Sequence, residues 1–86
     1  MNKERRQELN DVLDHLDDAI GRLEEIISDE QDAFDDLNEG LQNSKTGDGM
    51  LAAIDQMTEI SNDIEAVKVK IDKIINPKKT KNPNKG

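Results

Sequence analysis

The sequence contains no cysteine, tryptophan or tyrosine, and Phe34 is its only aromatic residue. Without cysteine, the chain can form neither a disulfide nor a zinc–thiolate site, and it offers no thiol nucleophile. Even the longest apolar runs, such as the one that ends at Ile54, are far shorter than the roughly 20 residues that span a bilayer. These absences predict a protein without a membrane span, and the polar N-terminal segment does not read as a signal peptide. We therefore expect a cytoplasmic protein.

Groups that commonly carry catalysis are also scarce. His15 is the only histidine, and it is flanked within one turn by aspartates. A general base needs a pocket and an orienting partner, so we interpret His15 as an exposed helix residue. There is no pattern of a catalytic triad, a phosphate loop or a dinucleotide site. The acidic segment before Gly40 fails the EF-hand rule, because Leu37 and Thr46 would occupy the third and twelfth ligand positions. We predict no enzyme activity, no cofactor and no metal ion.

The first half of the chain has an apolar pattern of helical period. Steps of four and three place such residues along one side of an α-helix, and only Glu30 interrupts the series. The series consists of Leu9, Leu13, Leu16, Ile20, Leu23, Ile27, Phe34 and Leu37. Asn2 is a suitable N-cap, and Gly40 is placed to supply a left-handed C-cap. We predict a first helix over about residues 3–38.

The second half repeats this pattern after a polar turn. Its series consists of Met50, Ala53, Met57, Ile60, Ile64, Val67, Ile71 and Ile74. Ser44 or Thr46 is expected to cap the helix, and Pro77 disfavours helical geometry in the residue before it. We predict a turn over about residues 39–46 and a second helix over about 47–76. The last ten residues carry no apolar side chain and are predicted to be a disordered basic tail, 77–86.

A short turn favours antiparallel packing of the two helices. Pairing residues whose numbers sum to about 84 makes every layer apolar except Glu30 opposite Ile54. The predicted layers are Phe34 on Met50, Ile27 on Met57, Leu23 on Ile60, Ile20 on Ile64, Leu16 on Val67, Leu13 on Ile71 and Leu9 on Ile74. The predicted fold is therefore all-α, an antiparallel two-helix hairpin of coiled-coil type forming one domain, 1–76.

The first helix carries a further apolar column beside its main series. This column consists of Val12, Ala19, Ile26 and Ala33. A two-stranded coil does not need it, and exposed contiguous apolar surface usually marks an interaction site. We expect this column to be the oligomer face of a homodimer, which would make a four-helix bundle.

Charge is strongly segregated along the chain. From Gln7 to Glu39 there are 13 acidic residues and one base, Arg22, whereas seven lysines and one acid lie from Lys68 to the end. In the antiparallel register, Lys68, Lys70 and Lys73 partly neutralise the N-terminal half of the first helix. The unopposed acids, which we call the acidic turn end, are Glu24, Glu25, Asp29, Asp32, Asp35, Asp36, Glu39 and Asp48. They are interpreted either as a solvated, solubilising face or as a surface that imitates nucleic acid.

The segment from Asp29 to Asp48 resembles the centre of a family of small proteins encoded by bacteriophages and other mobile elements. That family has an acidic helix, an aromatic-Asp-Asn-Leu-Pro-Glu-Gly-Leu-Gln-like turn, a cap with Ser and Gly, and a second acidic helix. Here Phe34 stands for the aromatic residue, Asp36 occupies the Asn place and Asn38 the Pro place. The resemblance covers about a quarter of the chain. It implies a helical hairpin in a phage setting, with no agreed activity and no catalytic residues.

Two functional hypotheses follow. The first is a phage-type protein–protein interaction module that binds and modulates, by inhibition, a host or defence protein in the bacterial cytoplasm. Its contact surface would be the acidic turn end, acting as a DNA or RNA mimic, with no direct nucleic-acid binding beyond weak contacts of the basic tail. The alternative is a structural or assembly protein that docks onto another helical protein through the apolar column.

Overall fold

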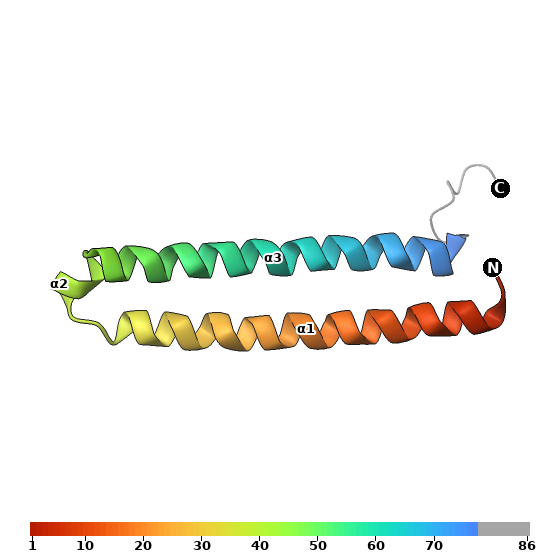
Figure 1. The fold of residues 1–86 in the computed structure, drawn as a ribbon, viewed down its shortest axis with the longest axis horizontal. Helices are drawn as coiled ribbons and strands as arrows, with labels where there is room; N and C mark the ends of the chain where they lie inside the picture. The colour runs from red at the N-terminus through yellow and green to blue at the C-terminus, as the bar shows by residue number, and fades with distance from the viewer. Residues whose placement is uncertain (78–86) are drawn as a thin grey trace.

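The computed structural model describes residues 1–77, which form a hairpin of two long helices (Figure 1). Helix α1 spans Lys3–Asp35, the short helix α2 spans Glu39–Gln42, and helix α3 spans Lys45–Ile75. α1 and α3 lie side by side and run in opposite directions, with α2 at the turn (Figure 1). Residues 1–77 contain no β-strand. The predicted all-α hairpin is confirmed, whereas the predicted tail falls, from residue 78 onward, outside the described residues.

The N-terminal end of α1 agrees with the prediction, whereas its C-terminal end does not. Asn2 is the N-cap, and its Oδ1 accepts a hydrogen bond of 2.8 Å from the backbone N–H of Arg5. At the other end, α1 stops at Asp35 rather than near residue 38. The reason is that Asn38 adopts an extended backbone and caps α2, with its side chain accepting from the N–H of Leu41 at 2.9 Å. Asn38 therefore begins a new helix instead of ending the first one.

The glycine expected to cap α1 has a different place. Gly40 lies inside α2, and no glycine within residues 1–77 has a positive φ, so the left-handed cap was a wrong prediction. α2 is tied to α1 by Gln42, whose Nε2 donates to the carbonyl of Phe34 at 3.1 Å. The turn predicted over about residues 39–46 thus contains a short helix held by side-chain hydrogen bonds.

The entry into α3 is a close packing point. Ser44, rather than Thr46, is the N-cap residue, and its hydroxyl donates to the carbonyl of Leu41 at 2.6 Å. Gly47 is buried, and a Cβ added there would lie 2.6 Å from the carbonyl carbon of Gln42 and 2.7 Å from the carbonyl oxygen of Leu41. A side chain at residue 47 would therefore collide with the backbone of α2. This close approach allows the sharp corner between α2 and α3.

The seam between α1 and α3 is as predicted on the α1 side. All eight apolar residues of the α1 series are at least partly buried, and Ile20 is 7% exposed. On α3, Met50, Met57, Ile64 and Ile71 are also partly buried.

The other half of the α3 seam differs from the prediction. The seam residues are Ile54, Ser61, Lys68 and Ile75, each one residue later than the predicted Ala53, Ile60, Val67 and Ile74. Ile60, Val67 and Ile74 are 48%, 44% and 51% exposed, so the predicted layers of Leu23 on Ile60, Leu16 on Val67 and Leu9 on Ile74 are wrong.

The geometry of antiparallel packing explains the shift. In a heptad repeat lettered a to g, the residues of the seam occupy positions a and d. In an antiparallel pair, an a residue of one helix shares a layer with a d residue of the other. The a positions of α1 form the column that contains Ile20, and this column lies over the α3 column that contains Ile64. The column of Ile64 therefore occupies the d positions of α3. Its companion column then lies four residues later in the heptad, at Lys68, and not three residues later, at Val67. An apolar column of α3 is consequently left outside the seam.

Among residues 1–77, neither of the two long helices nor α2 has the length and hydropathy of a membrane-spanning segment.

Candidate interaction surfaces

The acidic turn end is fully on the surface. All eight of its residues are exposed: Glu24, Glu25, Asp29, Asp32 and Asp35 on α1, Asp36 at its C-cap, Glu39 on α2 and Asp48 on α3. The hairpin brings them to one half of the molecule, because it folds the last turns of α1 beside the first turns of α3. From residue 24 to residue 59 the sequence has eleven acidic residues and one base, Lys45. This half of the rod therefore carries a strong negative charge.

Individual acids in this half differ in their local roles. Glu39 and Asp48 lie in the first turns of α2 and α3, where a carboxylate interacts favourably with the helix dipole. Asp35 accepts a hydrogen bond of 3.0 Å from Nε2 of Gln31. Glu39 belongs to α2 and not to α1, which ends at Asp35. Glu24, Glu25, Asp29 and Asp32 project from α1 itself, and Asp36 is its C-cap residue.

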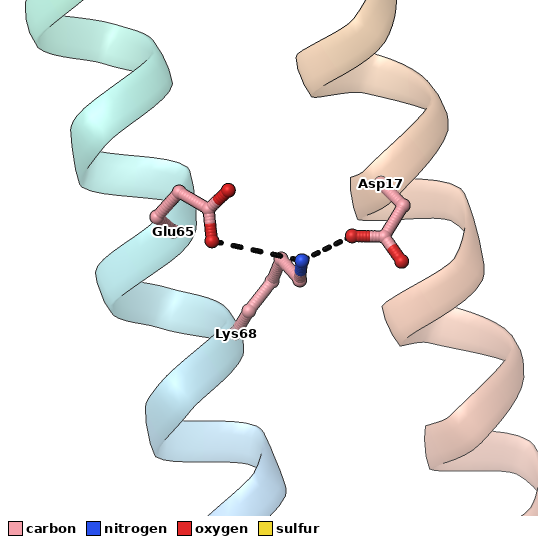
Figure 2. Close-up of polar contacts among 3 residues, drawn as sticks. All are labelled: Asp17, Glu65 and Lys68. Carbon is pink, nitrogen blue, oxygen red and sulfur yellow. Dashed lines mark ion pairs between the residues drawn. The ribbon is translucent and has the colours of Figure 1, made fainter.

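The opposite half of the rod contains a cross-helix ion pair. Figure 2 shows Lys68 of α3 reaching toward Asp17 of α1, with Glu65 one turn before it on α3. The Nζ of Lys68 forms an ion pair with Oδ1 of Asp17, and lies 3.6 Å from Oε1 of Glu65. The side chain of Lys68 is only 23% exposed, because its stem occupies a seam position. A base in the C-terminal half of α3 therefore neutralises Asp17 in the N-terminal half of α1, as the register predicted for Lys68.

The environment of Lys68 favours its charged form. The side-chain hydrogen bond with Asp17 is the main cause, and the charges of Asp17 and Glu65 add to it. Together they raise the pKa of Lys68 above the ordinary value of 10.5, in spite of partial desolvation. Sequence reasoning missed this residue as part of the seam, because the apolar Val67 beside it fitted the pattern better. The acids at positions 17 and 65, on both sides of one lysine, were the available signal.

An exposed apolar surface runs along one side of the hairpin. Each of its members directly precedes an a residue of the seam, and in an antiparallel pair these two columns fall on the same side. We call this surface the apolar strip; it consists of Val12, Ala19, Ile26 and Ala33 on α1 and Ala53, Ile60, Val67 and Ile74 on α3. The five larger side chains are 39–51% exposed. The sequence predicted the α1 half of this strip. It missed the α3 half, because those residues were assigned to the seam.

The rims of the apolar strip are less acidic than the rest of α1. The flanking heptad column of α1 contains Glu8, His15, Arg22 and Asp29, and that of α3 contains Gln56, Asp63 and Lys70. Arg22 is the one base between residues 7 and 44, and it lies on this rim. His15 is exposed, as predicted. The acidic columns of α1, which contain Asp11, Asp18, Glu25 and Asp32, lie on the side away from the strip.

Across residues 1–77, no group of three or more histidine, aspartate or glutamate side chains is arranged to hold a metal ion. No protein-family model matches the chain, and no curated protein or solved structure is significantly similar to it. The resemblance to small phage proteins therefore stays a prediction. The acidic turn end and the apolar strip are the two candidate interaction surfaces of the hairpin.

Proposed function

We propose that this protein is a non-enzymatic interaction module whose acidic turn end binds a basic surface of another protein. The observation that supports this proposal is the segregation of charge: the turn half of the rod has eleven acids and one base, and all eight residues of the acidic turn end are exposed. The half that contains the start of α1 and the end of α3 has Lys68, which forms an ion pair with Asp17. Between residues 24 and 59, Lys45 is the only base in the sequence.

A rigid, negatively charged rod suits one class of partner. Proteins that bind nucleic acid do so largely through basic grooves that contact phosphates. Carboxylates held at fixed spacing on a helix present a similar pattern of negative charge, and an acidic surface attracts such a groove at long range. A phage-encoded protein of this kind would inhibit a host or defence protein by occupying its groove.

The test is a pull-down from a bacterial lysate at low and high salt, with charge-reversal variants. Replacing Asp32, Asp35 and Asp36 by lysine should abolish binding of the partner. The matched control replaces Asp11, Asp14 and Asp18 by lysine, which are equally exposed on α1 but lie in the other half. Binding to the wild type and the control should weaken steeply as salt rises. Full binding by the variant at residues 32, 35 and 36 would sink the proposal.

A second candidate function is a structural or assembly role through the apolar strip. The observation that favours it is that both long helices contribute exposed apolar side chains to the same side, with Ile26 and Ile60 51% and 48% exposed. Association through such a surface would depend on apolar burial, so it would not weaken as salt rises. The sign of the salt effect separates the two candidates.

A further inference from the structure

The apolar strip lacks a cover within residues 1–77, although it has the composition of a helix–helix interface. Large and small residues alternate along its α1 half, and the numbers of facing members sum to 86: Val12 with Ile74, Ala19 with Val67, Ile26 with Ile60, and Ala33 with Ala53. Such alternation lets layers of side chains interdigitate with those of an opposing helix pair. The strip therefore fits a second pair of antiparallel helices rather than a single extended peptide.

The size of this side of the hairpin is adequate for a stable interface. α1 has 33 residues, so it is about 50 Å long at 1.5 Å per residue, and two helices side by side are roughly 20 Å wide. Covering most of this side would bury on the order of 900 Å² on each of two partners, or about 1,800 Å² in total. Stable interfaces bury about 1,200–2,000 Å² in total.

The rims of the strip indicate which helix pair covers it. Arg22 lies on the α1 rim and Asp63 on the α3 rim, and their numbers sum to 85, as do those of the ion-paired Asp17 and Lys68. The two residues are therefore at the same height on opposite rims. A second copy turned by half a revolution about the long axis of the rod places its Asp63 beside Arg22, and its Arg22 beside Asp63. At this height the two rims are thus complementary in charge between the copies.

We propose that the apolar strip is the interface with a second copy of this chain, forming a four-helix bundle in which α1 of each copy packs against α3 of the other. Arg22 of one copy then pairs with Asp63 of its partner, twice per dimer. The strongly acidic columns of α1 remain on the outside of the bundle. This proposal uses a different surface from the acidic turn end, so either proposal can fail without the other.

The experiment is sedimentation equilibrium of the full chain over a range of concentrations, with two variants of one helix. Val67→Ser removes an apolar side chain from the strip. Val69→Ser is the matched control, because Val69 is 54% exposed, against 44% for Val67, but lies on another side of α3. Neither side chain is in the seam, so both variants should keep the helical circular dichroism of the wild type.

We expect a dimer whose dissociation constant, Kd, rises roughly 10- to 30-fold in Val67→Ser, since each dimer loses two valine side chains from its interface. The Kd of Val69→Ser should stay within about twofold of wild type. A monomeric wild type at about 100 μM, a value chosen for weak association, would overturn the proposal. An equal loss in both variants would also overturn it.

Salt and orientation give two further readouts. Each copy carries a net charge of −8, so added salt should tighten the dimer, opposite to its effect on a basic partner. Because the chain has no cysteine, Gln7→Cys allows one spin label per copy near the start of α1. In the proposed bundle the two labels lie within about 25 Å of each other, roughly two helix diameters apart. Labels about 45 Å apart, near the length of a helix, would overturn the proposed orientation.

Discussion

Gly47 provides the sharpest test of the fold, because the structure predicts that alanine there has the opposite effect from alanine at other helical glycines. In a helix interior, Gly→Ala stabilises by about 1 kcal/mol. At Gly47 the added Cβ would lie 2.6 Å from the carbonyl carbon of Gln42 and 2.7 Å from the carbonyl oxygen of Leu41. These are backbone atoms, and α2 is anchored by the hydrogen bonds of Asn38 and Gln42. The clash therefore cannot be relieved by rotating a side chain.

The magnitude follows from these two opposing effects. Overpacking against a fixed neighbour costs about 1–3 kcal/mol, and contact with backbone belongs at the upper end of that range. After subtracting the gain of about 1 kcal/mol in helix propensity, Gly47→Ala should lose about 2 kcal/mol of unfolding free energy. Gly49→Ala should gain about 1 kcal/mol, because no heavy atom of residues 1–77 outside its own helical neighbourhood lies within 4 Å of a Cβ there.

The assay is thermal and urea unfolding followed by circular dichroism at 222 nm, with all proteins at one concentration, since association would shift the midpoint. The difference of about 3 kcal/mol between the two variants corresponds to roughly 12–24 °C in Tm for a chain of this size. Gly21→Ala is a second control, because its Cβ also meets open space. If Gly47→Ala were as stable as Gly49→Ala, the close packing of α2 on α3 would be refuted.

Two further predictions concern Lys68 and Asn38. The pKa of Lys68 is raised above the 10.5 of an unfolded chain, so its ion pair with Asp17 stabilises the hairpin below that pH and is lost as the pH rises through the raised value. The urea midpoint of the wild type should therefore fall relative to that of Lys68→Met as the pH rises above 10.5, and a constant difference between the two midpoints would contradict the role of the pair. Asn38→Ala removes the cap of α2 and should cost about 1 kcal/mol in urea unfolding, whereas the exposed Asn62→Ala should not destabilise the fold.

The sequence was sufficient to predict α1 and its seam, because α1 has a single clear series of large apolar residues from Leu9 to Leu37. On α3 it was misleading, since the column of Ile60, Val67 and Ile74 is more apolar than the neighbouring column of Ser61, Lys68 and Ile75, although the latter lies in the seam. Choosing between Val67 and Lys68 from composition favours valine. In the structure Lys68 lies in the seam, because the heptad positions of the α1 seam residues determine which columns of α3 face α1.

The turn shows a different limit. A glycine after a helix is a common left-handed cap, and Gly40 fits that rule. Asn38 competes by capping a new helix two residues earlier, and the hydrogen bond from Gln42 to Phe34 supports this choice. The glycine C-cap rule and the asparagine N-cap rule both use only local sequence, so neither predicts which of the two caps forms. The exposure of the acids could be predicted from the hairpin alone. Predicting the α3 half of the apolar strip required knowing which residues of α3 lie in the seam.

The position of the helix ends has a practical consequence for building larger proteins. α1 starts and α3 ends at the same end of the rod, opposite α2 (Figure 1). In the proposed bundle, the end of α3 in one copy would lie close to the start of α1 in the other. A short flexible linker between two copies in one gene would then hold them at a millimolar effective concentration. Such a tandem would be a single-chain bundle in which one acidic turn end could be altered while the other stays intact.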